Sequence, residues 1–117
     1  MLNNSNGFQT NVWGSAAWLF LHCITLNYNP ETQKKDYIRF FKSLAGVLPC
    51  KACRDNYHRT ITRHNKLKLK ASVFESRESL AFWLFQVHNY VIKCQMKNTN
   101  SSQYYPYYLY PRSIHAP

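Results

Sequence analysis

The sequence contains no long hydrophobic run. No uninterrupted apolar stretch is longer than the one from Ala16 to Leu21, whereas a membrane-spanning helix needs about 20 apolar residues. The first dozen residues contain no Lys or Arg and are rich in Asn, unlike a secretory signal or an Arg-rich transit peptide. We therefore expect a soluble chain with neither a membrane span nor a signal peptide.

Acidic residues are also scarce. Five Asp and Glu stand against 15 Lys and Arg, which gives a net charge of +10. The basic residues gather mainly between Arg54 and Lys70, with a second group from Lys93 to Lys97. They could form a solvated basic face, a nucleic-acid footprint, or a surface that attracts an acidic protein or a phosphorylated cofactor. Because no helix-turn-helix spacing, RNA-binding aromatic motif or paired zinc ligands accompany them, we do not expect nucleic acid as a partner.

What is present predicts one all-α domain. A chain of 117 residues, 45% apolar and 16% aromatic, can form one core but not two. Apolar residues recur at helical spacing and predict four helices, over residues 12–26, 30–48, 49–64 and 77–97. We expect the first helix to start at a Thr10 or Asn11 cap and to be buried nearly all round. The second helix would present Tyr37, Phe40, Phe41, Leu44 and Val47 to the core. Residues 65–74 are a basic connection that could contain a short strand.

The composition changes after Asn98. Asn, Ser and Thr dominate the next few residues, and the Tyr-rich stretch that follows contains prolines that a regular helix does not accept. We therefore predict a helical domain over residues 1–97 and an irregular aromatic tail over 98–117.

The four cysteines stand at positions 23, 50, 53 and 94. Cys50 and Cys53 form a CxxC pair, which is either half of a zinc site or a redox dithiol. Zinc requires four ligands, and without a second close pair His58 and His64 would have to complete the set. Cys23 and Cys94 lie on apolar helix faces, where they are either buried free cysteines or the two ends of a disulfide.

The redox interpretation has a physical argument in its favour. If the third helix begins at Pro49, both sulfurs lie in its first turn, where unpaired backbone N–H groups and the helix dipole favour a thiolate. Lys51 and Arg54 add positive charge beside them. We therefore expect a lowered pKa at the pair. The alternation of strands and helices that would indicate a thioredoxin fold is absent, so another electron acceptor is needed.

Three separated motifs carry a resemblance to a known family. They are Trp13-Gly14-x-x-x-Trp18-x-x-x-His22, Pro49-Cys50-x-x-Cys53-x-x-x-Tyr57 and Trp83-x-x-x-x-His88-Asn89-x-Val91. In this order and with these gaps, over about residues 12–93, they resemble the FAD-linked Erv/ALR sulfhydryl oxidases. That resemblance implies a four-helix bundle with a short fifth helix, noncovalently bound FAD and, in many members, a homodimer. It also implies that the flavin is contacted by Gly14, Trp18, His22, Tyr57, Phe85, His88, Asn89 and Val91.

The resemblance further implies a mechanism. Cys50 would be the outer sulfur that exchanges with substrate thiols, and Cys53 the inner sulfur beside the flavin, from which electrons pass to oxygen to give hydrogen peroxide. Neither residues 1–11 nor 98–117 contain the additional cysteine pair of cellular members. The expected partner is therefore a thiol protein, such as a thioredoxin- or glutaredoxin-like relay. This compact form resembles the oxidases of large cytoplasmic DNA viruses, which implies the host cytoplasm or the virion as the location. Otherwise the mitochondrial intermembrane space or the endoplasmic reticulum is expected.

The sequence also departs from the family pattern. Ile92 stands where the family motif has a second Asn, and the aromatic that stacks on adenine could be Tyr104, Tyr105, Tyr107 or Tyr108. Two alternatives to the oxidase remain: a basic protein- or nucleic-acid-binding module with a structural or zinc-bound CxxC, and a family member that has lost FAD.

Overall fold

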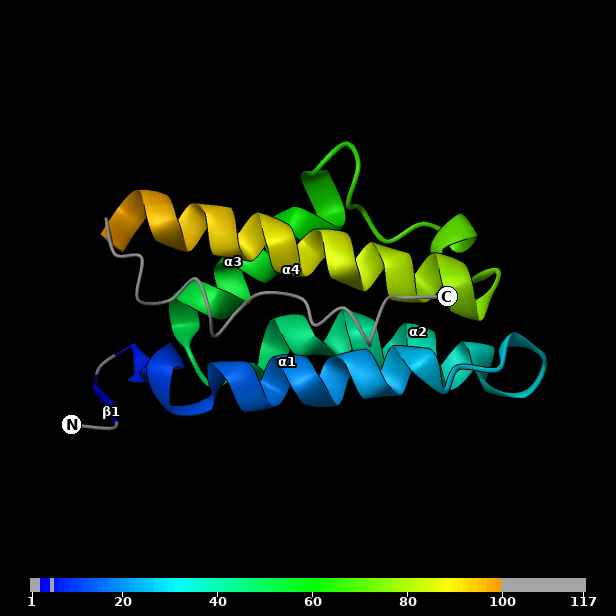
Figure 1. The fold of residues 1–117 in the computed structure, drawn as a ribbon, viewed down its shortest axis with the longest axis horizontal. Coiled ribbons are helices and arrows are strands. Elements are labelled where there is room, and N and C mark those ends of the chain that lie inside the picture. Colours follow the sequence, from blue (N-terminus) through cyan, green and yellow to red (C-terminus); the bar gives the residue numbers. More distant parts are fainter. Residues whose placement is uncertain (1–2, 5, 100–117) are drawn as a thin grey trace.

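The computed structural model describes residues 3–4 and 6–99, with side chains described for residues 6–97. Within these ranges the chain forms four α-helices, a short 3-10 helix and a two-stranded hairpin (Figure 1). The helices are α1 (Thr10–Leu26), α2 (Pro30–Val47), α3 (Lys51–Arg63) and α4 (Arg77–Thr99), with η1 (Ala71–Phe74) before the last. The predicted all-α bundle is confirmed, and none of the described helices is long and apolar enough to cross a membrane.

The helices form two contacting pairs. α1 lies alongside α4, and α2 packs against α3 (Figure 1). Phe41 of α2 is fully buried and meets Trp83 of α4 edge to face, with ring centroids 5.6 Å apart. Burying a side chain of this size contributes about 2–3 kcal/mol. The two rings therefore join the pairs around one core, in which Leu80, Leu84 and Val87 are also buried.

Local chemistry sets most helix boundaries. The Asn29 side chain accepts a hydrogen bond from the Glu31 backbone N–H at 3.0 Å and caps α2, whose first residue is Pro30. Proline is favoured there because its missing N–H has no partner in a helix anyway. The predicted cap of α1 was wrong: the capping position is Gln9, and its side chain makes no capping hydrogen bond.

An N-terminal hairpin is the largest departure from the predicted all-helical pattern. Strands β1 (Asn3–Asn4) and β2 (Gly7–Phe8) pair antiparallel, and Gly7 forms a further antiparallel bridge with Cys50. Strands of two residues have no detectable periodicity. Gly7 also pairs with a residue 43 positions away in the chain, which no local pattern shows.

The connection before α4 contains no strand. Residues 65–67 form turns and Ala71–Phe74 form η1. Leu67 and Phe74 are buried, and the Leu67 carbonyl accepts a hydrogen bond from Trp83 Nε1 at 2.8 Å. The Phe74 carbonyl accepts one from the hydroxyl of Tyr28, a fully buried residue between α1 and α2. The segment therefore closes one side of the core.

Two expectations about burial were wrong. Leu19 and Phe20 of α1 are 56% and 63% exposed, and Cys23 and Leu26 of the same face are also exposed. On α2, Val47 is 67% exposed instead of lying in the core. α1 is apolar around much of its circumference, but within the described chain only one side of it is covered. The predicted aromatic tail and the position of any fifth helix lie outside the described residues.

Candidate active site

Cys50 and Cys53 lie at the start of α3. Because Pro49 cannot continue α2, the chain turns there and α3 begins at Lys51 with Cys50 as its capping residue. The Cys50 sulfur accepts a hydrogen bond from the backbone N–H of Cys53 at 3.2 Å. Cys53 itself lies within the first turn. The predicted arrangement of a dithiol at a helix start is confirmed, and neither sulfur is in a disulfide here.

The pKa of Cys53 is not lowered as expected. Burial, together with the neighbouring Cys50 side chain, raises the pKa of the Cys53 thiol to about 12, and the charge of Arg54 opposes this only weakly. Desolvation disfavours the charged form of any acid, and here it outweighs the helix dipole. In the reduced pair, Cys53 therefore keeps its proton at neutral pH.

A cavity of about 560 Å³ begins at Cys53 and extends between the four helices. Its size is within the range of pockets that hold organic cofactors. Its wall includes five of the predicted site residues, contributed by three helices: Gly14, Trp18, Cys53, Tyr57 and Val91.

The cavity lining combines aromatic and basic side chains. Cys53 and Tyr57 occupy the first half of α3, whereas Arg63 lies ten residues beyond Cys53, about 15 Å along the helix. Arg59, His64 and Lys97 also line the cavity. Such a lining suits an elongated ligand with a planar ring system near the dithiol and an anionic group farther along. A flavin dinucleotide has both parts, so the residues present fit FAD.

The Tyr57 ring is held firmly in this wall. Its hydroxyl donates a hydrogen bond to the Phe41 backbone carbonyl. Burial raises the pKa of Tyr57 above its ordinary value, so the phenol stays neutral and serves as a flat apolar surface.

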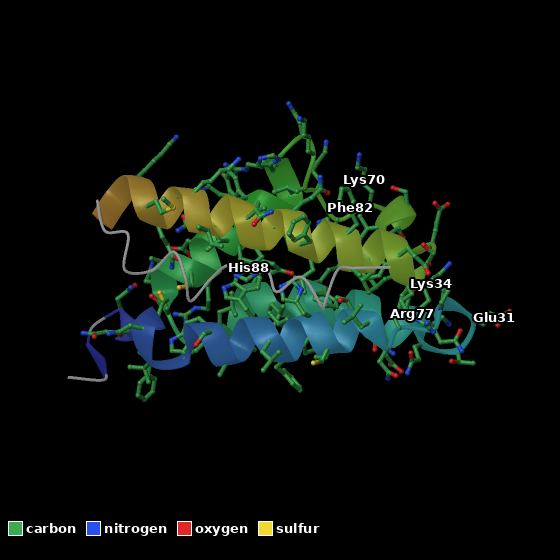
Figure 2. All side chains as sticks on the ribbon, in the orientation of Figure 1. Glu31, Lys34, Lys70, Arg77, Phe82 and His88 are labelled. Atoms are coloured by element: carbon green, nitrogen blue, oxygen red, sulfur yellow. The ribbon has the colours of Figure 1, made fainter. Side chains whose placement is uncertain are left out.

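Behind Trp18 lies a pair of buried histidines. His22 Nε2 and His88 Nδ1 are 3.0 Å apart, and the His88 ring stacks on Trp18 with centroids separated by 4.1 Å. Figure 2 shows His88 on the side of α4 that faces α1. Burial lowers the pKa of His88 to about 4, so its ring is neutral at physiological pH. The two histidines are thus buried next to the cavity and do not line it.

The remaining predicted residues are less closely associated with the cavity. Asn89 and Phe85 are half-buried on α4 and do not belong to the cavity wall. Ile92, which replaces the family's second Asn, is buried.

Sequence reasoning missed several lining residues, among them Arg59, Arg63 and Cys94. The i, i+4 spacing of the two arginines was a usable signal, but nothing local shows that this face of α3 borders a cavity. Cys94 lines the cavity on α4, whereas Cys23 is exposed on α1, and no disulfide joins them in the structure.

Within residues 6–97, no three His, Cys, Asp or Glu side chains gather as a metal-binding set would. His58, one of the ligands that a zinc site would have needed, is exposed on α3. The zinc alternative therefore has no set of ligands in this part of the chain.

These features define a helical protein with a dithiol at the wall of a cofactor-sized cavity. The chain belongs to the Erv1/Alr family, whose family model matches residues 15–106. It is 43% identical over 82 residues to a probable FAD-linked sulfhydryl oxidase of Acanthamoeba polyphaga mimivirus, covering 68% of this chain and 55% of that protein.

Cellular proteins are similar too. The FAD-linked sulfhydryl oxidase ERV1 of Arabidopsis thaliana is 35% identical over 82 residues, covering 67% of this chain and 39% of that protein. The mitochondrial FAD-linked sulfhydryl oxidase ERV1 of Saccharomyces cerevisiae is 31% identical over 83 residues, covering 68% of this chain and 41% of that protein. The chain thus spans about half the length, or less, of these relatives.

Proposed function

We propose that this protein is an FAD-dependent sulfhydryl oxidase, which forms disulfide bonds in thiol proteins and passes the electrons to oxygen, giving hydrogen peroxide. The observation that carries the proposal is the position of Cys53 in the wall of a cavity that Trp18 and Tyr57 also line. Cys53 so placed can face a planar redox cofactor, while Cys50 lies outside the cavity wall and is the sulfur left for exchange with another thiol. The names of the relatives support the same cofactor and reaction.

The cofactor would be held by aromatic walls and basic side chains. The residues that we assign to flavin contact line the cavity: Gly14, Trp18, Tyr57 and Val91. The residues that would support them from α1 and α4 are His22, His88, Asn89 and Phe85. Arg63, Arg59 and Lys97 are suited to the pyrophosphate, because cations favour phosphate oxygens. Bound FAD supplies a two-electron acceptor that oxygen can reoxidise.

The chain's own part is thiol–disulfide exchange. A substrate thiolate attacks Cys50 of the Cys50–Cys53 disulfide, forming a mixed disulfide while Cys53 leaves and takes up a proton. The second substrate thiolate then attacks the substrate sulfur of the mixed disulfide, and Cys50 leaves as a thiolate. The substrate gains one disulfide and the Cys50–Cys53 pair holds the two electrons. The N–H of Cys53, which donates to the Cys50 sulfur, stabilises that thiolate.

The visible spectrum of the purified protein tests this proposal directly. We expect a flavin absorption band that bleaches when dithiothreitol is added without air and returns when air is admitted, while hydrogen peroxide accumulates. A colourless protein that cannot be reconstituted with FAD contradicts the proposal and returns attention to the basic binding module.

We also propose that the protein is a homodimer that uses the outer face of α1. Leu19, Phe20 and Leu26 are exposed there in one patch at helical spacing, with Cys23 between them. Apolar faces of this kind in soluble proteins are commonly covered by a partner. A second copy of the chain would cover the face with an identical one, as two-fold interfaces do.

Substrates and location follow from the proposed chemistry. A thiol protein such as a thioredoxin- or glutaredoxin-like relay has the exposed reactive cysteine that attack on Cys50 requires. The similarity to the mimivirus protein supports action in the cytoplasm of an infected cell or in the virion, where a dedicated oxidase would make disulfides in a reducing compartment. The similarity to mitochondrial proteins keeps the intermembrane space as the alternative.

A further inference from the structure

The segment Asn6–Phe8 lies directly over Cys50. The Phe8 backbone N–H donates to the Pro49 carbonyl at 2.8 Å, and the Lys51 N–H donates to the Asn6 carbonyl at 2.6 Å. The indole N–H of Trp13 donates to the Phe8 carbonyl at 3.0 Å and anchors the far end. We call residues 6–8 the strap.

The strap covers the sulfur that exchange needs. Cys50 is only 5% exposed. The side-chain N–H of Asn6 donates to the Cys50 sulfur at 3.3 Å, and the same side chain accepts a hydrogen bond from the Ala52 N–H at 2.9 Å. The Asn6 side chain therefore occupies a position from which an incoming thiolate would contact Cys50, and a protein substrate needs the strap to move.

The pairing is that of an added strand. Gly7 and Cys50 form an antiparallel bridge, with backbone hydrogen bonds to the residues on either side of Cys50. Extended peptides bind to exposed strand edges through the same kind of main-chain pairing. The edge at Pro49–Lys51 can thus pair with an extended peptide next to Cys50.

Gly7 is what allows the strap to lie so close. Its φ is +107°, and a Cβ atom there would be 2.3 Å from the Pro49 carbonyl oxygen. Both the conformation and the approach exclude any larger residue. Gly46 is a natural reference, because an added Cβ at that position meets nothing within 4 Å.

We propose that the strap holds the place of the substrate. The extended, cysteine-bearing segment of a thiol protein lies along Pro49–Lys51 after the strap has left, farther from the Pro49 carbonyl than Gly7 does, and its sulfur takes the place of the Asn6 side-chain amide. This inference rests on the proposed exchange at Cys50 and adds how the substrate is recognised. In that step the new bond joins the substrate sulfur to Cys50, the Cys50–Cys53 bond breaks, and its electron pair stays on Cys53.

The first experiment compares full-length wild type, Gly7→Ala and Gly46→Ala after reduction. The rate of alkylation of each cysteine by iodoacetamide is followed by mass spectrometry. Because Gly7→Ala loosens the strap, we expect Cys50 to react about tenfold faster in that variant, and Gly46→Ala to match wild type. Equal alkylation rates of Cys50 in all three proteins would contradict the proposal that the strap covers Cys50. Asn6→Ala, which removes both side-chain contacts and keeps Gly7, is the second variant if Gly7→Ala does not fold, and the same rise is expected.

The second experiment tests whether the strap and the substrate bind to the same edge at Pro49–Lys51. Oxidation of a reduced, unfolded ribonuclease is measured with and without a peptide of sequence Asn-Asn-Ser-Asn-Gly-Phe-Gln, which corresponds to residues 3–9. We expect the peptide to inhibit the variant with the loosened strap competitively and wild type less. If Cys50 is alkylated faster in the variant but the peptide does not inhibit ribonuclease oxidation, the substrate does not bind where the strap does. Alkylation needs no flavin, so a colourless protein that oxidises neither ribonuclease nor dithiothreitol, yet shows the alkylation difference, counts against the proposed oxidase and leaves the strap standing.

Discussion

The imidazole of His88 stacks on the indole of Trp18, 4.1 Å between centroids and 12° from parallel, in the interface between α4 and α1. Nε2 of His22 lies 3.0 Å from Nδ1 of the same imidazole, within hydrogen-bond distance. The cavity wall at Trp18 is therefore supported by a ring that has to stay neutral.

Stability should fall on acidification because of His88. Its folded-state pKa is lowered to about 4 from the ordinary 6.5, so between these values the unfolded chain binds a proton that the folded protein does not. The contribution of the neutral His88 to the free energy of unfolding is fully present above pH 6.5. It is lost as pH falls toward 4, by roughly 3 kcal/mol in total. Urea unfolding of wild type and His88→Asn at pH 4.5 and pH 7.5 measures it. A difference between the two proteins that does not change with pH contradicts the prediction.

The two cysteines of the pair should be equally necessary for turnover. We expect Cys50→Ser and Cys53→Ser each to lower the rate of thiol oxidation by at least about a hundredfold, because neither variant can form the Cys50–Cys53 disulfide. Both should retain the flavin absorption band, since the cavity keeps its aromatic and basic walls. Wild-type turnover in either variant would exclude the proposed exchange.

The exposed face of α1 predicts the oligomeric state. Phe20→Glu places a charge in the centre of the apolar patch, and we expect it to weaken self-association about a hundredfold or more. Analytical ultracentrifugation over a concentration series gives the result. Phe82→Glu is the matched control: Phe82 is 58% exposed on α4 (Figure 2), and its replacement should leave self-association as in wild type. Identical sedimentation of wild type and both variants would contradict a dimer interface on α1.

The basic side chains of the cavity wall should govern the affinity for FAD. We expect Arg63→Ala to weaken FAD binding about five- to tenfold at low salt, with a smaller effect at high salt, because the lost interaction is electrostatic. Fluorescence titration of the apoprotein measures the dissociation constant. Arg39→Ala is the control, since Arg39 is exposed on α2 and paired with Asp36. Equal affinity in the two variants would remove Arg63 from the site.

Local features of the sequence predicted the helices and the place of the dithiol at a helix start. Pro30 and Asn29 mark the start of α2, Pro49 marks its end, and the Cys50 motif was correctly expected at a helix start. Trp18 and Tyr57 were expected to contact a flavin only through their match to family motifs, and both lie in the cavity wall. Such signals are readable because capping, proline geometry and helical spacing act within a few residues.

Burial was where reasoning from the sequence failed. The apolar pattern of α1 placed Leu19 and Phe20 inside the protein, yet both are exposed, because periodicity shows that a face is apolar without showing what covers it. The Cys53 thiol was expected to be acidic from its place at the helix start, but desolvation by surrounding helices raises its pKa.

The sequence by itself determined the elements: four helices, their boundaries within a few residues, and a dithiol at the start of the third. Only the tertiary structure decided that Gly7 pairs with Cys50, that His22 meets His88, and that Arg63 and Cys94 share a cavity with Cys53. The residues in these relationships are 10 to 66 positions apart in the chain. The interaction energies between them depend on burial and distance. Both quantities exist only once the chain has folded.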